Sequence, residues 1–212
     1  MQPTSQKRLP RQVREQQMLE AAVEVFSTSG FTGASMDEIA ARAGISKPMV
    51  YAYLGTKEEL FLACVRQAGT WLMEALIRTA EADLPADEQL WRGLRGFFGF
   101  VGAHRDGWRV LYRQARGQEP FAAEVARLRA QLVDVVAGLL GRLIAASGRR
   151  HSETEVSVMA HALVGAGESL ADWVVDHPEE APEVAATRLM NFVWLGAGEL
   201  LRGGRWVPQS DG

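Results

Sequence analysis

Apolar residues recur at helical spacing along nearly the whole of this 212-residue chain. Near the N-terminus, for example, Val13, Ala21 and Val25 fall on one face of a helix. No stretch alternates apolar and polar residues as a half-buried strand does, and no hairpin signal occurs. The pattern therefore predicts an all-α fold of about nine helices. They cover about residues 10–29, 36–43, 47–54, 57–82, 86–103, 108–116, 120–147, 152–177 and 182–202.

Two short helices joined by a tight turn are predicted near the N-terminus. Ser35 and Glu38 have the spacing of a capping box, in which each side chain bonds the other residue's backbone N–H. Gly44 follows the first helix, where a left-handed terminator is favoured. Ser46 is a good N-cap for the second helix, and Pro48 falls in its first turn. These features together are typical of a helix-turn-helix.

The second of these helices carries outward side chains that suit DNA. Residues near the start of a recognition helix touch base edges, so Lys47 can reach guanine and Met49 a thymine methyl. The tyrosine hydroxyls and Lys57, at the next helix N-terminus, suit phosphate oxygens. The alternative is an ordinary helix pair whose aromatic side chains are packed inside. The candidate DNA-binding residues are Ser35, Ser46, Lys47, Pro48, Met49, Tyr51, Tyr53 and Lys57.

Several short motifs fall in a fixed order between about Val13 and Leu62. They are Gly30-Phe31, Ser35-Met36-Asp37-Glu38-Ile39-Ala40, Gly44-Ile45-Ser46, Tyr51-Ala52-Tyr53-Leu54 and Lys57-Glu58-Glu59-Leu60. In these features the chain resembles the TetR family of transcriptional repressors. Leu54-Gly55 departs from the family pattern, since many relatives carry Phe and a bulkier residue there. The resemblance implies an N-terminal arm and DNA-binding domain at 1–56, followed by a helical effector-binding and dimerisation domain at 57–212.

Charge is distributed unevenly, although the net charge of −3 does not by itself favour DNA. Residues 1–57 contain seven basic and five acidic side chains, whereas the remainder contains sixteen basic and twenty-one acidic ones. The basic share is therefore concentrated where DNA would bind. Lys7 and Arg8 lie in a polar arm at 1–9, which either follows phosphates together with Arg11 and Arg14 or is a solvated tail.

The last two predicted helices are rich in small residues, which let helix backbones approach closely. The resemblance implies that these helices form a four-helix bundle between two subunits, although close packing within one chain would use the same residues. A homodimer would place two recognition helices on a palindromic operator in double-stranded DNA. The small residues are Ala160, Ala162, Gly165, Ala166, Gly167, Ala171, Ala185, Ala186, Gly196, Ala197 and Gly198.

A small-molecule effector would need a pocket in the second domain. The glycines of the 86–103 helix leave room either for a ligand or, as we expect, for a neighbouring helix. His161, Glu168 and Asp172 share one helical face, which would line a pocket, face solvent or contact a second subunit. The candidate effector-binding residues are Phe98, Trp108, Tyr112, His161, Glu168 and Trp173.

Other functional classes find little support in the sequence. No nucleophile elbow, phosphate loop or zinc-protease motif occurs, and the four histidines lack metal-ligand spacing with Cys64, so we expect no enzyme, cofactor or metal site. Cys64, the one cysteine, fits an apolar stripe as a core residue. No run of eighteen apolar residues and no apolar N-terminal region occurs, so we expect a cytoplasmic protein without membrane contact.

The sequence as a whole favours a DNA-binding transcriptional regulator. We expect a repressor that a small apolar or amphipathic effector releases from its operator. The alternative is a helix-turn-helix adaptor that a protein partner regulates without any small-molecule ligand.

Overall fold

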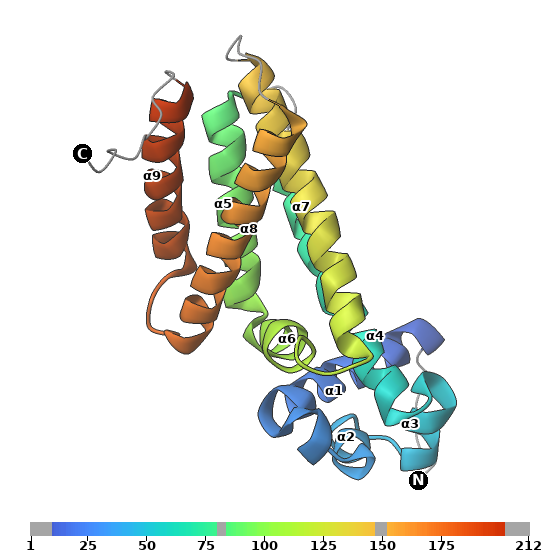
Figure 1. Ribbon diagram of the computed structural model, residues 1–212. Coiled ribbons are helices and arrows are strands. Elements are labelled where there is room, and N and C mark those ends of the chain that lie inside the picture. Colours follow the sequence, from blue (N-terminus) through green and yellow to red (C-terminus); the bar gives the residue numbers. More distant parts are fainter. Residues whose placement is uncertain (1–9, 80–83, 147–151, 202–212) are drawn as a thin grey trace, which may run out of the picture. The chain divides into compact units, whose positions relative to one another are not determined.

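The computed structural model describes residues 10–79, 84–146 and 152–201, and all regular elements in these ranges are helices (Figure 1). The all-α prediction is therefore confirmed. The predicted arm at 1–9, the last turn of the helix predicted to reach residue 82, and the C-terminal tail lie outside the described residues. The helices are α1 (Arg11–Gly33), α2 (Met36–Arg42), α3 (Lys47–Leu54), α4 (Lys57–Thr79), α5 (Ala86–Ala103), α6 (Arg105–Trp108), the π-helical η1 (Arg109–Gln114), α7 (Phe121–Ala146), α8 (Glu153–Asp176) and α9 (Pro182–Leu201).

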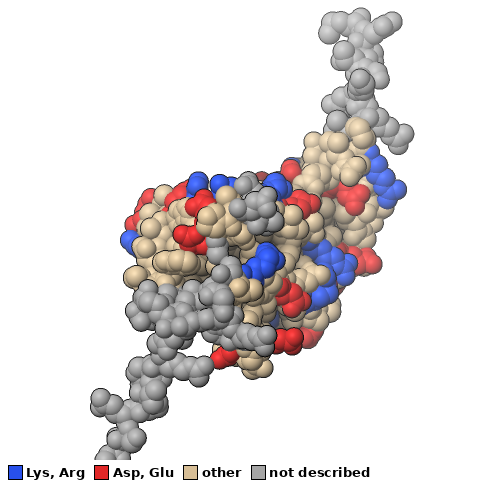
Figure 2. Space-filling model, turned by 90° about the horizontal axis from the view of Figure 1, so that it is seen from above, with Lys and Arg blue, Asp and Glu red and all other residues tan. Residues whose placement is uncertain are grey.

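The chain divides into two compact units. The first contains Met1–Thr70 and Asp106–Ala126, and the second contains Trp71–Arg105 and Arg127–Gly212. The unit that holds the N-terminal helices therefore extends beyond residue 56, where the sequence suggested a functional boundary. On the face shown in Figure 2, acidic and basic side chains are interspersed, as expected for a chain of small net charge.

The core of the first unit is aromatic. Phe26, Phe61 and Phe121 are buried, and Phe31 lies against the last two. The rings of Phe26 and Phe61 meet edge to face at 4.9 Å between centroids, and those of Phe61 and Phe121 lie tilted to each other at 4.5 Å. Edge-to-face rings gain electrostatic attraction beyond the area that they bury. This cluster joins α1 to the first turns of α4 and α7.

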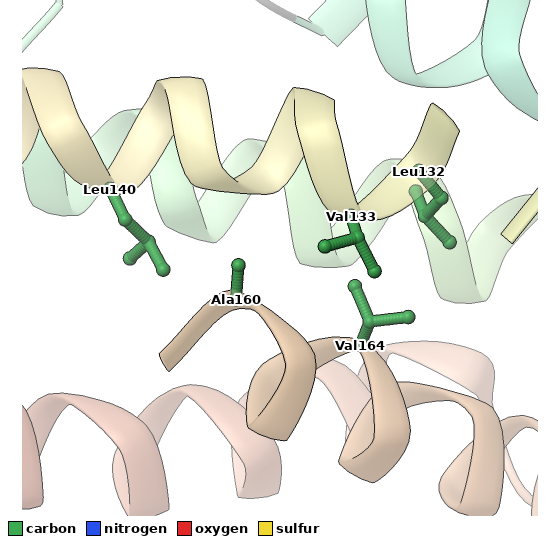
Figure 3. Close-up of a cluster of buried hydrophobic side chains, with 5 residues drawn as sticks. All are labelled: Leu132, Val133, Leu140, Ala160 and Val164. Carbon is green, nitrogen blue, oxygen red and sulfur yellow. The ribbon is translucent and has the colours of Figure 1, made fainter. Parts of the chain in front are cut away.

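The second unit is built from α5, α7, α8, α9 and the C-terminal part of α4. Figure 3 shows Leu132, Val133 and Leu140 of α7 facing Ala160 and Val164 of α8, and all five side chains are buried. The small side chain of Ala160 lets the larger residues of α7 fill the contact. The contact between α7 and α8 is thus aliphatic.

The segment after α5 differs from the sequence prediction. A turn was expected at 104–107, with a helix from Trp108 onward. Instead only His104 interrupts the helix, and α6 begins at Arg105. Asp106 accepts a bond from Arg109 one turn later, at 2.8 Å, which stabilises a helical first turn at these residues. The prediction of a turn was therefore wrong.

Helix α4 is long and apolar enough over Lys57–Arg78 to match a membrane span by length and composition alone. Its side chains Phe61, Cys64 and Val65 are fully buried in the first unit. The core helix of a globular protein has the same length and composition, and α4 is such a helix in this fold.

Candidate functional site

The turn between α2 and α3 forms as its glycine predicts. Gly44 adopts a left-handed φ of +66°, and its N–H donates to the Ala41 carbonyl at 3.1 Å. The Ile45 N–H donates to the Ala40 carbonyl at 3.0 Å, which satisfies another carbonyl of the last turn of α2. Val50 of α3 is fully buried, so α3 is anchored by its inner face. This geometry leaves the opposite face of α3 exposed.

The predicted caps around this motif form to different extents. Ser35 accepts from the Glu38 N–H at 3.1 Å, whereas Ser46 occupies the N-cap of α3 without a side-chain cap bond. Thr56 and Glu59 form both bonds of a capping box, at 2.7 and 3.2 Å. The start of α4 is therefore held more firmly than the start of α3.

The N-terminal turn of α3 presents a lysine and a proline to solvent. Lys47 and Pro48 are exposed, and the Lys47 ammonium donates to the Asp37 carboxylate at 2.8 Å. This bond raises the pKa of Lys47, with the negative charge of Asp37 as a second cause. An exposed ion pair contributes little free energy, so Lys47 can exchange Asp37 for another anion at small cost. Tyr51, one turn further on, is 45% exposed.

Two arginines at the start of α1 lie against α3. The Arg11 guanidinium lies over the Tyr53 ring, 5.3 Å from its centroid. An Arg14 nitrogen approaches the Met49 sulfur at 4.0 Å. The sequence suggested a phosphate-binding arm that included both arginines, but it gave no sign that they contact α3. Two positive charges therefore border the exposed face of α3.

Lys57 occupies a more structural position than the sequence suggested. Its ammonium donates to the carbonyls of Thr32 and Ala34, at 3.3 and 2.8 Å, and lies 4.9 Å from the centre of the Phe31 ring. These carbonyls follow Gly30, whose φ of +68° breaks α1. Lys57 therefore ties the end of α1 to the start of α4, and any phosphate contact would use its remaining donor.

A second candidate site is a cavity of about 440 Å³ that lies wholly within the second unit. All but three of its lining residues are apolar or glycine, and the polar ones are Gln89, Asp134 and Arg142. Its volume lies in the range of small-molecule pockets, and the apolar lining with a few polar groups is also typical of them. The lining residues are Leu76, Ile77, Gln89, Leu90, Gly93, Leu94, Phe97, Leu132, Asp134, Val135, Val136, Gly138, Leu139, Leu140, Arg142, Leu143, Leu163, Val164 and Gly167.

The glycines of α5 serve two purposes. A Cβ at Gly102 would overlap Pro182 of α9, so this glycine allows close helix packing, as the sequence suggested. Gly93 instead lines the cavity, and a Cβ added there would meet nothing within 4 Å. The glycine-rich pattern was the available signal for the cavity, but close packing was the expected explanation.

The six candidate effector-binding residues are not brought together, and none lines this cavity. Trp108 and Tyr112 are buried in the first unit, where their rings stack at 3.9 Å between centroids. In the second unit Phe98 is fully buried beside Phe97, and His161 is exposed with its Nδ1 2.8 Å from the Ser157 carbonyl.

The remaining two candidates of this set each have a partner within the second unit. Glu168 is buried and accepts from the Arg129 Nε at 2.9 and 3.2 Å. Trp173 stacks on His177, with 4.3 Å between ring centroids. The shared face predicted for His161, Glu168 and Asp172 thus includes both exposed and buried positions. An effector contact by any of the six stays a prediction.

The fold and the exposed face of α3 define a helix-turn-helix DNA-binding protein. The sequence matches two family descriptions, "Bacterial regulatory proteins, tetR family" over residues 18–64 and "Tetracyclin repressor-like, C-terminal domain" over residues 86–196. The chain therefore belongs to the TetR family of transcriptional regulators, which are not enzymes.

Similar proteins include both activators and repressors. The HTH-type transcriptional activator FasR of Mycolicibacterium smegmatis is 30% identical over 89% of this chain and 85% of its own length. The HTH-type transcriptional repressor NicS of Pseudomonas putida is 33% identical over 61% of this chain and 60% of its own length. A crystal structure of a TetR-like transcriptional regulator from Rhodococcus sp. RHA1 is 47% identical, covers 90% of this chain and 99% of that one, and has a TM-score of 0.77.

Proposed function

We propose that the protein binds a specific operator by inserting α3 into the DNA major groove. The observation that carries the proposal is the exposure of Lys47 and Tyr51 on a helix anchored by the buried Val50. Lys47 and Met49 would contact base edges, because they lie in the first turn of α3. Ser46 and Pro48 lie in the same turn, and Ser35 begins the supporting helix α2.

Phosphate contacts would hold α3 in register on the operator. Tyr51 and Tyr53 offer hydroxyl groups, and Lys57 retains a donor beyond its two carbonyl bonds. The neighbouring Arg11 and Arg14 add positive charge beside α3. Such contacts carry no sequence information, but they contribute most of the salt-dependent part of binding.

We also propose that the protein acts as a homodimer through α8 and α9. Phe192 and Leu195 of α9 are 78% and 72% exposed, and Val158 of α8 is 62% exposed. Exposed apolar side chains that gather on one pair of helices are typical of a protein interface. A second copy of the chain would cover them and supply the second recognition helix that a palindromic operator requires.

A small apolar or amphipathic effector bound in the cavity would control operator affinity. Such a ligand shifts operator affinity only by its differential affinity for the DNA-bound and free conformations. We propose that the protein is a repressor in the cytoplasm, where its DNA lies, and that the effector releases it. The similarity to the repressor NicS supports this proposal, whereas the similarity to the activator FasR supports the opposite effect on transcription. Expression of a reporter gene placed under the operator tests whether the protein represses or activates.

Binding to the DNA that flanks its own gene, measured at several salt concentrations, tests the central proposal. We expect nanomolar affinity that falls steeply with salt, since each neutralised phosphate contributes a slope of about −0.9 in the logarithmic plot. Lys47→Ala should weaken binding about tenfold or more, because a base contact contributes roughly 1–3 kcal/mol.

Arg78→Ala is the matched control, since Arg78 is an exposed basic residue of α4 in the second unit. It should leave operator affinity unchanged. Equal losses in both variants would mean that Lys47 acts only through general charge. Weak binding that is indifferent to sequence, on this DNA and on a randomised operator library, would contradict the proposal.

A further inference from the structure

The effector cavity is asymmetric along its length. In Figure 1 α5 and α7 run in opposite directions, so Gln89 and Arg142 mark one end of the cavity while Phe97 and Leu132 mark the other. Ile77 lies at the first end and is 63% exposed. Phe97 and Leu132 are both buried. The end that holds Arg142 is therefore open to solvent, whereas the other end is lined by the buried Phe97 and Leu132, with the exposed Asp134 at its edge.

Arg142 is the cationic group of the cavity lining. Its Nη1 lies 3.8 Å from the position of a Cβ on Gly138, so the side chain folds back along α7 over that glycine. Among the described residues, no ion pair or hydrogen bond joins its guanidinium to another group. A guanidinium offers five donors in a planar fork that matches a carboxylate. An anionic group at the open end would find this fork unoccupied.

The length of the lining limits the size of the ligand. From Leu132 to Leu143 the cavity follows α7 for about 16 Å, at about 1.5 Å per residue. An extended aliphatic chain advances by about 1.3 Å per methylene, so a chain of about twelve carbons spans this distance.

We propose that the cavity binds a long-chain aliphatic carboxylate, with the carboxylate on Arg142 and the chain directed toward Phe97 and Leu132. This inference rests on the effector control proposed above and names the chemical class of the effector. The chain would replace water along Leu94, Val136 and Leu139, where an apolar ligand gains most from burial.

Asp134 supports this orientation and not the reverse one. It lies two helical turns from Arg142 on the same stripe of α7, about 12 Å away. A cationic head at Asp134 would direct its tail toward Arg142 and would leave that guanidinium without an anion. A carboxylate at Arg142 keeps its own charge about 12 Å from that of Asp134.

Calorimetric titration of the full chain with three ligands of equal chain length tests the proposal. The ligands are dodecanoate, dodecan-1-ol and dodecyltrimethylammonium, each kept below its micelle concentration. We expect dodecanoate to bind at least tenfold more tightly than the other two. Arg142→Gln should remove this preference, whereas Arg142→Lys should keep part of it, because the charge remains but the planar fork is lost.

Two further variants separate the head group from the cavity itself. Arg78→Gln is the matched control, since Arg78 is an exposed arginine of the second unit that does not line the cavity, and it should not weaken dodecanoate binding. Gly93→Leu should abolish binding of all three ligands, since its side chain enters free space in the cavity. Circular dichroism and the unfolding midpoint show that each variant is folded. Equal affinity for the three ligands, or a dodecanoate affinity that Arg142→Gln leaves unchanged, would overturn the assignment, and so would tighter binding of the ammonium ligand.

Operator binding measured with and without saturating dodecanoate distinguishes this inference from the proposed function. Arg142-dependent binding of dodecanoate without any change in operator affinity would support the ligand class and refute effector control. A change in operator affinity caused by dodecan-1-ol alone would support effector control and refute the carboxylate.

Discussion

The two compact units of this protein are packed in different ways. In the first, Phe26, Phe61 and Phe121 meet ring against ring and leave α1, α4 and α7 little freedom at their contact. In the second, leucines, valines and glycines surround a cavity of about 440 Å³. Dense packing fixes geometry, whereas an unfilled apolar space gives up dispersion contacts that a ligand can restore. The unit that would position α3 contains a densely packed aromatic cluster, and the unit that would bind a ligand is incompletely filled.

The largest expected effect comes from removing an aromatic ring of the first unit. Phe61→Ala should lower the free energy of unfolding by about 3–5 kcal/mol, because it leaves a cavity among three other rings. Leu139→Ala, at the wall of the existing cavity, should cost less than half as much, since part of its surface already faces empty space. Urea unfolding measures both, and equal costs would mean that the two units are packed alike.

The buried ion pair of the second unit should give the next largest effect. Glu168→Gln leaves the Arg129 guanidinium beside a neutral amide and should cost about 1–3 kcal/mol. The double variant Arg129→Met with Glu168→Leu should recover most of this loss, because it removes both charges of the pair together. Unfolding midpoints of the three variants test this, and a double variant less stable than Glu168→Gln would contradict it.

The same substitution at two glycines should change stability in opposite directions. Gly55→Ala should destabilise by about 1–2 kcal/mol, because its φ of +72° is unfavourable for alanine and its Cβ would displace the Glu59 carboxylate. Gly93→Ala should stabilise by up to about 1 kcal/mol, since alanine is the better helix former and nothing obstructs it. Thermal unfolding of both variants provides the comparison, and shifts of the same sign would refute it.

The smallest effect concerns the only cysteine. Burial raises the pKa of Cys64 to about 12, and its Sγ lies 3.9 Å from the Leu19 carbonyl. At pH 8 the native thiol should therefore resist alkylation, while the urea-unfolded chain reacts quickly. The pKa of Cys64 is higher in the folded than in the unfolded chain, so the thiol does not change the free energy of unfolding below pH about 8.5. Above that pH the unfolded chain ionises first, and the free energy of unfolding declines as pH rises toward 12. Rapid alkylation of the native protein would show that the first unit opens readily.

Local sequence signals predicted the elements of the first unit well. Gly44 has the left-handed conformation expected of it, and both bonds of the Thr56 and Glu59 capping box form. Such signals work because each involves residues within four positions of one another. One of the two bonds predicted for the capping box at Ser35 forms. The Ser35 hydroxyl accepts from the Glu38 N–H, but the Glu38 side chain makes no bond to the Ser35 N–H.

Sites assembled from distant helices were harder to predict. Trp108 and Tyr112 share a face as their spacing indicates, but their rings stack on each other within the first unit. The cavity depends on α4, α5, α7 and α8 together, and helical periodicity does not reveal which faces leave a space between them. Arg142 carried no local sign of a role, because its importance comes only from the apolar residues around it.

The first unit is assembled from two separate stretches of sequence, Met1–Thr70 and Asp106–Ala126. Phe121, from the second stretch, packs against Phe31 and Phe61 from the first. A chimaeric regulator built by joining residues 1–56 to a foreign domain would therefore lack both Phe61 and Phe121, and Phe26 and Phe31 would lose the rings against which they pack. Moving the first unit to another protein requires both stretches to be moved together. Exchange of the second unit therefore needs several chain junctions and not a single one.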